Sequence, residues 1–203
     1  MKYFEKIKGD RIYLSPMNSD DYEIYTKWMN DKSVTENLSM HTQIVTLNSE
    51  KQWLEKNNNE YTFSIILKEE DRLLGNVSLM EVDLINGKAV LGIFIGEKDD
   101  RNKGYGKEAI KLILNYGFNS LNLNNIMLQV YSFNEKAINT YKKIGFKTFG
   151  IRRSCKYHDG VIYDEVYMDI VKEEFNLIEE FIFVPWFDTF ITILIWFYKG
   201  NMI

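Results

Sequence analysis

The sequence predicts a mixed α/β (α+β) domain in which a central, mostly antiparallel, twisted sheet is flanked by helices. Strand-like apolar runs bounded by Gly, Asn and Asp turn signals recur along the chain. Segments with an apolar residue at every third or fourth position lie between them, as in amphipathic helices. The 203 residues, 45% of them hydrophobic, suffice for one domain with a substantial core.

The first half of the chain is expected to contain four strands and two helices. Residues 11–15 alternate as a strand, and Ser19-Asp20-Asp21 can begin an amphipathic helix that reaches Met29. A second helix is expected over residues 49–56. Three further strands are expected to pair antiparallel, the last two through an Asn86-Gly87 turn, and they cover residues 62–67, 73–82 and 89–95.

The second half is expected to alternate helices with strands. A helix follows the glycine-rich segment near residue 105, and a strand is expected over residues 126–131. Residues 135–144 form the next helix, which Gly145 ends. Residues 147–156 and 161–170 are expected to pair as a hairpin through the Asp159-Gly160 turn.

The most informative segment is the glycine loop, residues 101–107 (RNKGYGK), between an apolar strand and a helix. Two glycines let the main chain approach an anion closely, and the helix start offers unpaired N–H groups at the positive end of its dipole. The loop therefore predicts a phosphate site made of backbone, although an ordinary basic connection would look similar. It is neither a Walker loop nor a dinucleotide loop, because the flanking glycine, lysine and hydroxyl positions do not match.

A second motif covers residues 129–146, where a strand ends in a polar turn and a helix follows and stops at a glycine. The two motifs together resemble the GNAT acetyltransferase superfamily. The opening Gly9-Asp10-Arg11 and the terminal hairpin resemble its branch of ribosomal-protein N-terminal and polyamine acetyltransferases. This resemblance covers about residues 1–174. The matching positions are Arg101, Gly104, Gly106, Asn134, Ala137, Tyr141, Lys143, Gly145 and Phe146.

The resemblance implies a GNAT-like fold whose middle strands splay apart around the pantetheine arm of acetyl-coenzyme A, the acetyl donor. Asn102 departs from the family pattern, because many relatives carry glycine there. Phe94 and Ile95 would lie along the pantetheine arm, and they can also be core residues. The residues expected to contact acetyl-coenzyme A are Phe94, Ile95, Arg101, Asn102, Lys103, Gly104, Tyr105, Gly106, Lys107, Asn134, Ala137 and Lys143.

The family chemistry is direct attack of a neutral amine on the acetyl thioester. Tyr141 occupies the family's general-acid position, and a tyrosine of ordinary pKa (~10) is protonated at neutral pH, although its ring could simply pack on the core. The general base is less defined, because Glu81, Glu97 and Glu36 are all acidic candidates and none lies in a diagnostic motif. Glu97 follows the splayed strand, but its charged run could be a solvated face, and water could relay the proton. Substrate-contact candidates are Tyr25, Asp31, Glu36 and Glu81, with helix capping and core packing as the alternative for the early helices.

Composition excludes several other classes. The formal net charge of −4 is unlike the basic face of a nucleic-acid binder. One cysteine, Cys155, and two histidines, His41 and His158, show no metal-ligand spacing, so no metal is expected. Cys155 is expected to be a strand residue, because no motif places a histidine beside it. Residues 1–14 lack the apolar core of a signal peptide, so a cytoplasmic location is expected.

The sequence divides into an acetyltransferase domain, residues 1–174, and a hydrophobic extension, residues 175–203. Aromatic and β-branched residues crowd positions 181–198, which Pro185 and Asp188 interrupt. Three interpretations stay open: a helix that covers the core or forms a homodimer, a tail that contacts the membrane, and an extension without a selected function.

The expected function is transfer of an acetyl group to a primary amine, which can be a protein N-terminus, a polyamine or a small amino compound. The alternative is a non-catalytic acyl-coenzyme A sensor or a membrane-associated binding protein. Asn134 and Tyr141 favour catalysis, because a binding module has no need of a proton donor for the thiolate.

Overall fold

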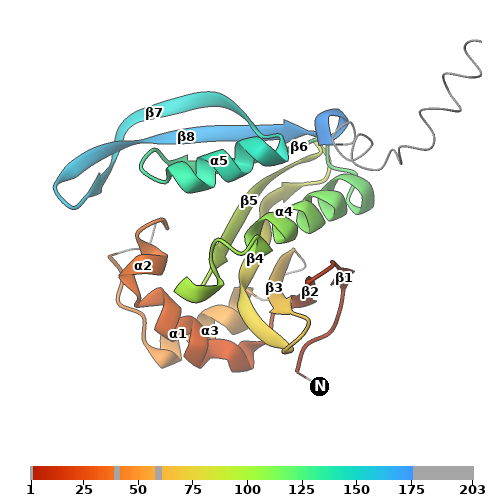
Figure 1. Cartoon of the computed structure of the whole chain (residues 1–203), viewed down its shortest axis with the longest axis vertical. Coiled ribbons are helices and arrows are strands. Elements are labelled where there is room, and N and C mark those ends of the chain that lie inside the picture. The colour runs from red at the N-terminus through yellow and green to blue at the C-terminus, as the bar shows by residue number, and fades with distance from the viewer. Residues whose placement is uncertain (1, 39–41, 58–60, 176–203) are drawn as a thin grey trace, which may run out of the picture.

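One sheet of eight strands organises the computed structural model, which describes residues 2–38, 42–57 and 61–175 (Figure 1). In these residues the strand order is β1-β2-β3-β4-β5-β6-β8-β7. Neighbouring strands are antiparallel except β5 and β6. The strands are β1 (Ile7–Lys8), β2 (Ile12–Pro16), β3 (Thr62–Leu67), β4 (Arg72–Asp83), β5 (Lys88–Ile95), β6 (Asn125–Tyr131), β7 (Lys147–His158) and β8 (Val161–Val171). The predicted mixed α/β class is confirmed.

Helices cover the sheet. They are α1 (Tyr22–Met29), α2 (Lys32–Thr35), α3 (Leu47–Asn57), α4 (Tyr105–Asn115) and α5 (Glu135–Ile144), with 3₁₀ turns at Ser19–Asp21 and Lys98–Asp100 and a π-helical turn at Tyr116–Ser120. The expected elements are present with their ends shifted by two residues or fewer. β1 and α2 were not predicted from the sequence, because two and four residues are too few to show a periodic pattern.

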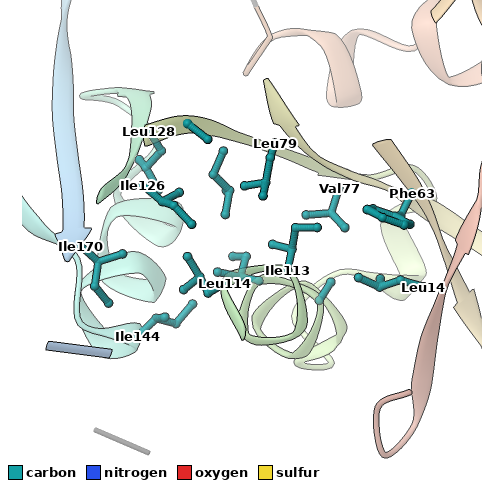
Figure 2. Packing of buried hydrophobic residues seen from close by; sticks show 14 of the residues in the cluster. Leu14, Phe63, Val77, Leu79, Ile113, Leu114, Ile126, Leu128, Ile144 and Ile170 are labelled. Atoms are coloured by element: carbon teal, nitrogen blue, oxygen red, sulfur yellow. The ribbon is translucent and has the colours of Figure 1, made fainter. Parts of the chain in front are cut away.

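Two apolar cores lie on opposite faces of the sheet. Successive side chains of a strand point to opposite faces, so Ile65 enters one core and Ile66 the other. The first core packs strand residues against α4 and α5; Figure 2 shows Ile113 and Leu114 of α4 among them. The second core packs α1, α2 and α3 on the other face, around Trp28. The sheet is therefore covered on both sides.

The middle of the sheet opens between β5 and β6. These strands pair in parallel at only three positions, which end with Val90 opposite Met127. Beyond that point β5 continues beside β4 to Ile95, whereas β6 continues beside β8 to Tyr131. The expected splay of the middle strands is confirmed.

The described part of the chain ends inside the first core. Phe175 is buried, and its ring lies 5.4 Å from that of Phe118, so the folded body includes this first residue of the predicted extension. Residues 181–198, on which the membrane and homodimer interpretations depend, lie outside the described residues. Among the described helices, none has the length and hydropathy to span a bilayer.

Candidate active site

The glycine loop connects the open end of β5 to α4. Gly96 follows β5 where only a glycine fits, because a Cβ there would lie 2.0 Å from Cε2 of Trp28. Two left-handed residues then turn the chain, Asn102 (φ 64°) and Gly104 (φ 88°). Glycine adopts this conformation freely, and asparagine tolerates it better than most residues. The turn places the start of α4 beside the end of β5.

Backbone amide groups at the start of α4 are available to an anion. The first hydrogen bond of the helix runs from the amide of Glu108 to the carbonyl oxygen of Gly104 (3.1 Å). The amides of Tyr105, Gly106 and Lys107 precede it, so they have no acceptor within the helix. Asn102, Lys103, Gly104 and Lys107 are exposed, so solvent reaches the loop.

Arg11 and Glu108 hold the loop in place. The Arg11 guanidinium donates to Glu108 Oε2 (3.2 Å) and to the carbonyl oxygen of Lys103 (2.9 Å), and it lies 5.0 Å from the centre of the Tyr105 ring. Glu108 Oε1 also accepts from the amide of Arg11 (2.9 Å). The sequence analysis missed this pair as a site feature, because the residues are 97 positions apart.

The Arg101 side chain contacts protein oxygens. Its guanidinium donates to the carbonyl oxygens of Ile95 (3.1 Å) and Gly96 (2.7 Å). It also donates to the carbonyl oxygen of Ser33 in α2 (2.8 Å). Arg101 therefore ties the end of β5 to α2, while its backbone belongs to the glycine loop.

A buried carboxylate anchors the turn before the loop. Asp100 accepts two hydrogen bonds from the Arg72 guanidinium (2.6 and 3.1 Å), and Lys103 Nζ lies 3.8 Å from its Oδ1. The hydrogen bonds from Arg72 lower the pKa of Asp100, and burial opposes this change. The pair joins Lys98–Asp100 to the start of β4.

The second motif forms α5 with both of its ends capped. The Asn134 side chain accepts from the amide of Ala137 (3.1 Å), and Gly145 ends the helix in a left-handed conformation (φ 117°). Asn134 thus has a structural role as the N-cap, and Lys143 is exposed in the last turn.

Tyr141 places a half-buried phenol on α5. Its ring packs edge-on against Phe146 (5.8 Å between centres), and its hydroxyl has no hydrogen-bond partner among the described residues. Burial raises the pKa of Tyr141 to about 12. The hydroxyl is therefore protonated at neutral pH and able to donate.

Glu97 is bound to α1. Its Oε1 accepts from Lys27 Nζ (2.5 Å) and from Trp28 Nε1 (2.9 Å), and these hydrogen bonds lower its pKa. A carboxylate held in this way is a weak proton acceptor. The geometry thus argues against Glu97 as the general base and gives it a structural role between α1 and the end of β5.

The remaining substrate candidates do not form one cluster. Tyr25 is only 1% exposed, and its ring packs edge-on against Trp28 and Phe94, which places Phe94 in the second core. Asp31 caps α2 by accepting from the amide of Ser33 (2.8 Å). Glu81 is exposed on β4 just beyond Met80, the partner of Val90, which lies about 16 Å along β5 from Ile95. Glu36 lies near the β7–β8 hairpin, with its Oε2 3.9 Å from Nε2 of His158 at the end of β7.

An aromatic cluster on that hairpin is a further feature that the sequence analysis missed. The imidazole of His158 stacks on Phe133 (5.0 Å, 14°), which stacks in turn on Tyr131. Lys156 is 6% exposed, and its Nζ lies 4.4 Å from the centre of the Tyr131 ring. The Asp159-Gly160 turn was the only sequence signal related to this contact, because it predicts the hairpin. The contact itself has no local signal, since β6 and the hairpin are separated in sequence.

Cys155 lies in β7, so its expected place in a strand is confirmed.

A family model described as an acetyltransferase (GNAT) domain matches residues 14–167. Uncharacterized N-acetyltransferase p20 of Bacillus licheniformis is 27% identical over 177 aligned residues, which cover 84% of this chain and 98% of that protein. Uncharacterized N-acetyltransferase YnaD of Bacillus subtilis (strain 168) is 27% identical over 172 residues, which cover 84% and 99%.

Solved structures show the same fold. A GNAT-family acetyltransferase from Bacillus anthracis matches with a TM-score of 0.73 and 25% identity, over 83% of this chain and 99% of that one. The spermidine N-acetyltransferase from Vibrio cholerae, in complex with CoA and spermine, matches with a TM-score of 0.74 and 22% identity, over 82% and 99%. This chain belongs to the GNAT acetyltransferase family. It is an acetyl-coenzyme A-dependent N-acetyltransferase.

Proposed function

We propose that this enzyme acetylates a primary amine of a small molecule or a peptide, with acetyl-coenzyme A bound in the splay between β5 and β6. The observation that carries the proposal is the position of the unpaired α4 amides directly beside the open end of β5. Tyr141 lies on α5, the helix that follows β6 across the splay. An anion site, a gap for the pantetheine arm and a proton donor thus belong to neighbouring elements.

The residues present fit a pyrophosphate at the glycine loop. The amides of Tyr105, Gly106 and Lys107 would donate to it, and the dipole of α4 and the exposed lysines would favour its charge. A Cβ at Gly106 would meet only Ile95 and Ile93, at ordinary contact distances of 3.8 and 3.9 Å. Packing within the protein therefore does not require glycine there, whereas close approach of a ligand would.

Bound acetyl-coenzyme A would supply the acetyl group as a thioester. The amine must be neutral to attack, and Tyr141 would donate a proton to the departing thiolate. With its pKa raised to about 12, the hydroxyl is protonated at neutral pH, so it has a proton to donate. The Vibrio cholerae neighbour, a spermidine N-acetyltransferase, supports an amine acceptor, and a polyamine, a peptide N-terminus and a small amino compound all fit this class.

A matched pair of glycine variants tests the donor site. We expect Gly106→Val to weaken acetyl-coenzyme A binding by at least tenfold, because the added side chain would lie where the pyrophosphate approaches the amides. Gly150→Val is the control: Gly150 lies in β7, and its Cβ would meet only Cβ of Tyr167, at 3.8 Å. Calorimetry measures both affinities, and circular dichroism checks the fold. Equal affinities in the two folded variants would contradict the proposed site.

A further inference from the structure

His158 is held at the tip of the β7–β8 hairpin against residues from two other parts of the chain. Its ring stacks on Phe133 of the β6–α5 connection, and its side chain is 14% exposed. Its Nε2 lies 3.9 Å from Oε2 of Glu36, directly after α2, and 3.6 Å from Oδ2 of Asp159. The imidazole is therefore oriented by packing, and it faces two carboxylates.

The other titratable side chains near His158 include Lys32, Lys156 and Tyr163. Lys32 of α2 forms an ion pair with Asp159 (2.8 Å), which leaves Glu36 as the carboxylate on α2's side of the imidazole. Lys156 lies two residues before His158 on β7, and it donates to the carbonyl oxygen of Leu38 (3.3 Å). Tyr163 of β8 lies 6.5 Å from the imidazole, measured between ring centres. A protonated imidazole would thus lie within 4 Å of two carboxylates, Glu36 and Asp159.

The His158 ring lies beside the open end of the splay. Tyr131 is four residues beyond Met127, the last β6 residue paired with β5, and Phe133 directly precedes the α5 cap Asn134. Across the opening, Glu36 follows α2, which Arg101 ties to the glycine loop through Ser33. The imidazole therefore lies between the two segments that border the gap, α2 and the β6–α5 connection.

We propose that His158 is the general base of the proposed amine acetylation, with Glu36 stabilising the imidazolium. Most of a primary amine is protonated at neutral pH, so its ammonium must lose a proton before attack. His158 takes this proton, directly or through one water molecule. The nitrogen then bonds to the acetyl carbon, the carbon–sulfur bond breaks, and the thiolate receives a proton from Tyr141. The nitrogen loses its second proton as the amide forms, and this proton restores the Tyr141 phenol through solvent. The imidazolium releases the first proton to solvent, so the products are the amide, the free thiol and one proton.

Two variants separate proton transfer from packing. The side chain of His158→Phe keeps an aromatic ring on Phe133 but cannot accept a proton. The side chain of His158→Gln is polar, but its amide group does not act as a base. We expect each to lower kcat/KM at pH 7 by about 10²-fold with an unchanged affinity for acetyl-coenzyme A. The wild type is first assayed with spermidine, an unblocked tetrapeptide and glucosamine. The release of free thiol by all variants is then measured with the amine that the wild type turns over fastest.

The pH dependence of kcat/KM provides the readout that a structural role would not change. We expect the wild-type kcat/KM to fall as the pH is lowered, because a protonated base cannot accept the proton of the amine, and both His158 variants to lose this dependence. Glu36→Gln should lower kcat/KM at pH 7, because a negative charge 3.9 Å from the imidazole that stabilises the imidazolium is lost. Wild-type kcat/KM in either folded His158 variant, or an unchanged profile, would overturn the proposal. No wild-type turnover with any amine would instead contradict the proposed function on which it depends.

Discussion

Burial sets the protonation state of Tyr141. The half-buried phenol has a pKa raised to about 12, and no described residue binds its hydroxyl. A thiolate that leaves the splay would thus meet a donor that is still protonated at pH 7 to 10.

At this scale we expect Tyr141→Phe to lower kcat by about 10²-fold or more, because the ring and its packing remain while the proton is lost. The affinity for acetyl-coenzyme A should not change. The wild-type kcat should show no fall below pH 10 from ionisation of this residue, since its pKa lies above that range. Tyr157→Phe is the control, because Tyr157 is 68% exposed on β7. A Tyr141→Phe enzyme as fast as this control would show that another group protonates the thiolate.

At the scale of elements, ties between distant segments hold the glycine loop. Arg11, in the segment before β2, donates to the loop directly. Arg72 of β4 binds Asp100, which directly precedes the loop, and Arg101 of the loop donates to α2. The pKa of Asp100 is lowered in the folded state, so its contribution to stability is complete above its unfolded pKa of ~3.9 and is lost as the pH falls through the folded value.

Asp100→Asn should therefore lower the free energy of unfolding at pH 7 by about 1–3 kcal/mol. We expect a loss near the lower end of this range, because the Arg72 side chain is 38% exposed and solvent screens its interaction with Asp100. The difference from wild type should shrink as the pH falls below about 4. Urea unfolding at several pH values measures both effects, with Asp99→Asn, an exposed neighbour in the same turn, as the control. A constant difference across this pH range would show that the ion pair is not its source.

Local signals made some elements predictable from the sequence. The bounds of α5 match the expectation because Asn134 and Gly145, which cap it, are adjacent to the helix. The splay has no local signal, and only the family resemblance implied it. Site residues that depend on distant contacts were the hardest to assign: Glu97 lies in a charged run that suggested solvent exposure, whereas Lys27 and Trp28 bind its carboxylate. His158 meets Phe133 only because the hairpin folds back toward β6.

For the whole molecule, β5 and β6 form the one parallel pair among the described strands of a sheet that is covered on both faces. The loop proposed to bind the pyrophosphate follows β5, and the proposed proton donor Tyr141 lies on the helix that follows β6. The activity proposed for this arrangement is amine acetylation by acetyl-coenzyme A.

The most direct test is the release of free thiol by the purified full chain with spermidine, unblocked peptides, aminoglycosides or amino sugars, followed by mass analysis of the amine. We expect thiol release that requires both acetyl-coenzyme A and one class of amine, and that yields the acetylated amine. The contrary result is a folded protein that binds acetyl-coenzyme A but releases no more thiol with any of these amines than without them. This result would contradict amine acetylation and favour a binding role.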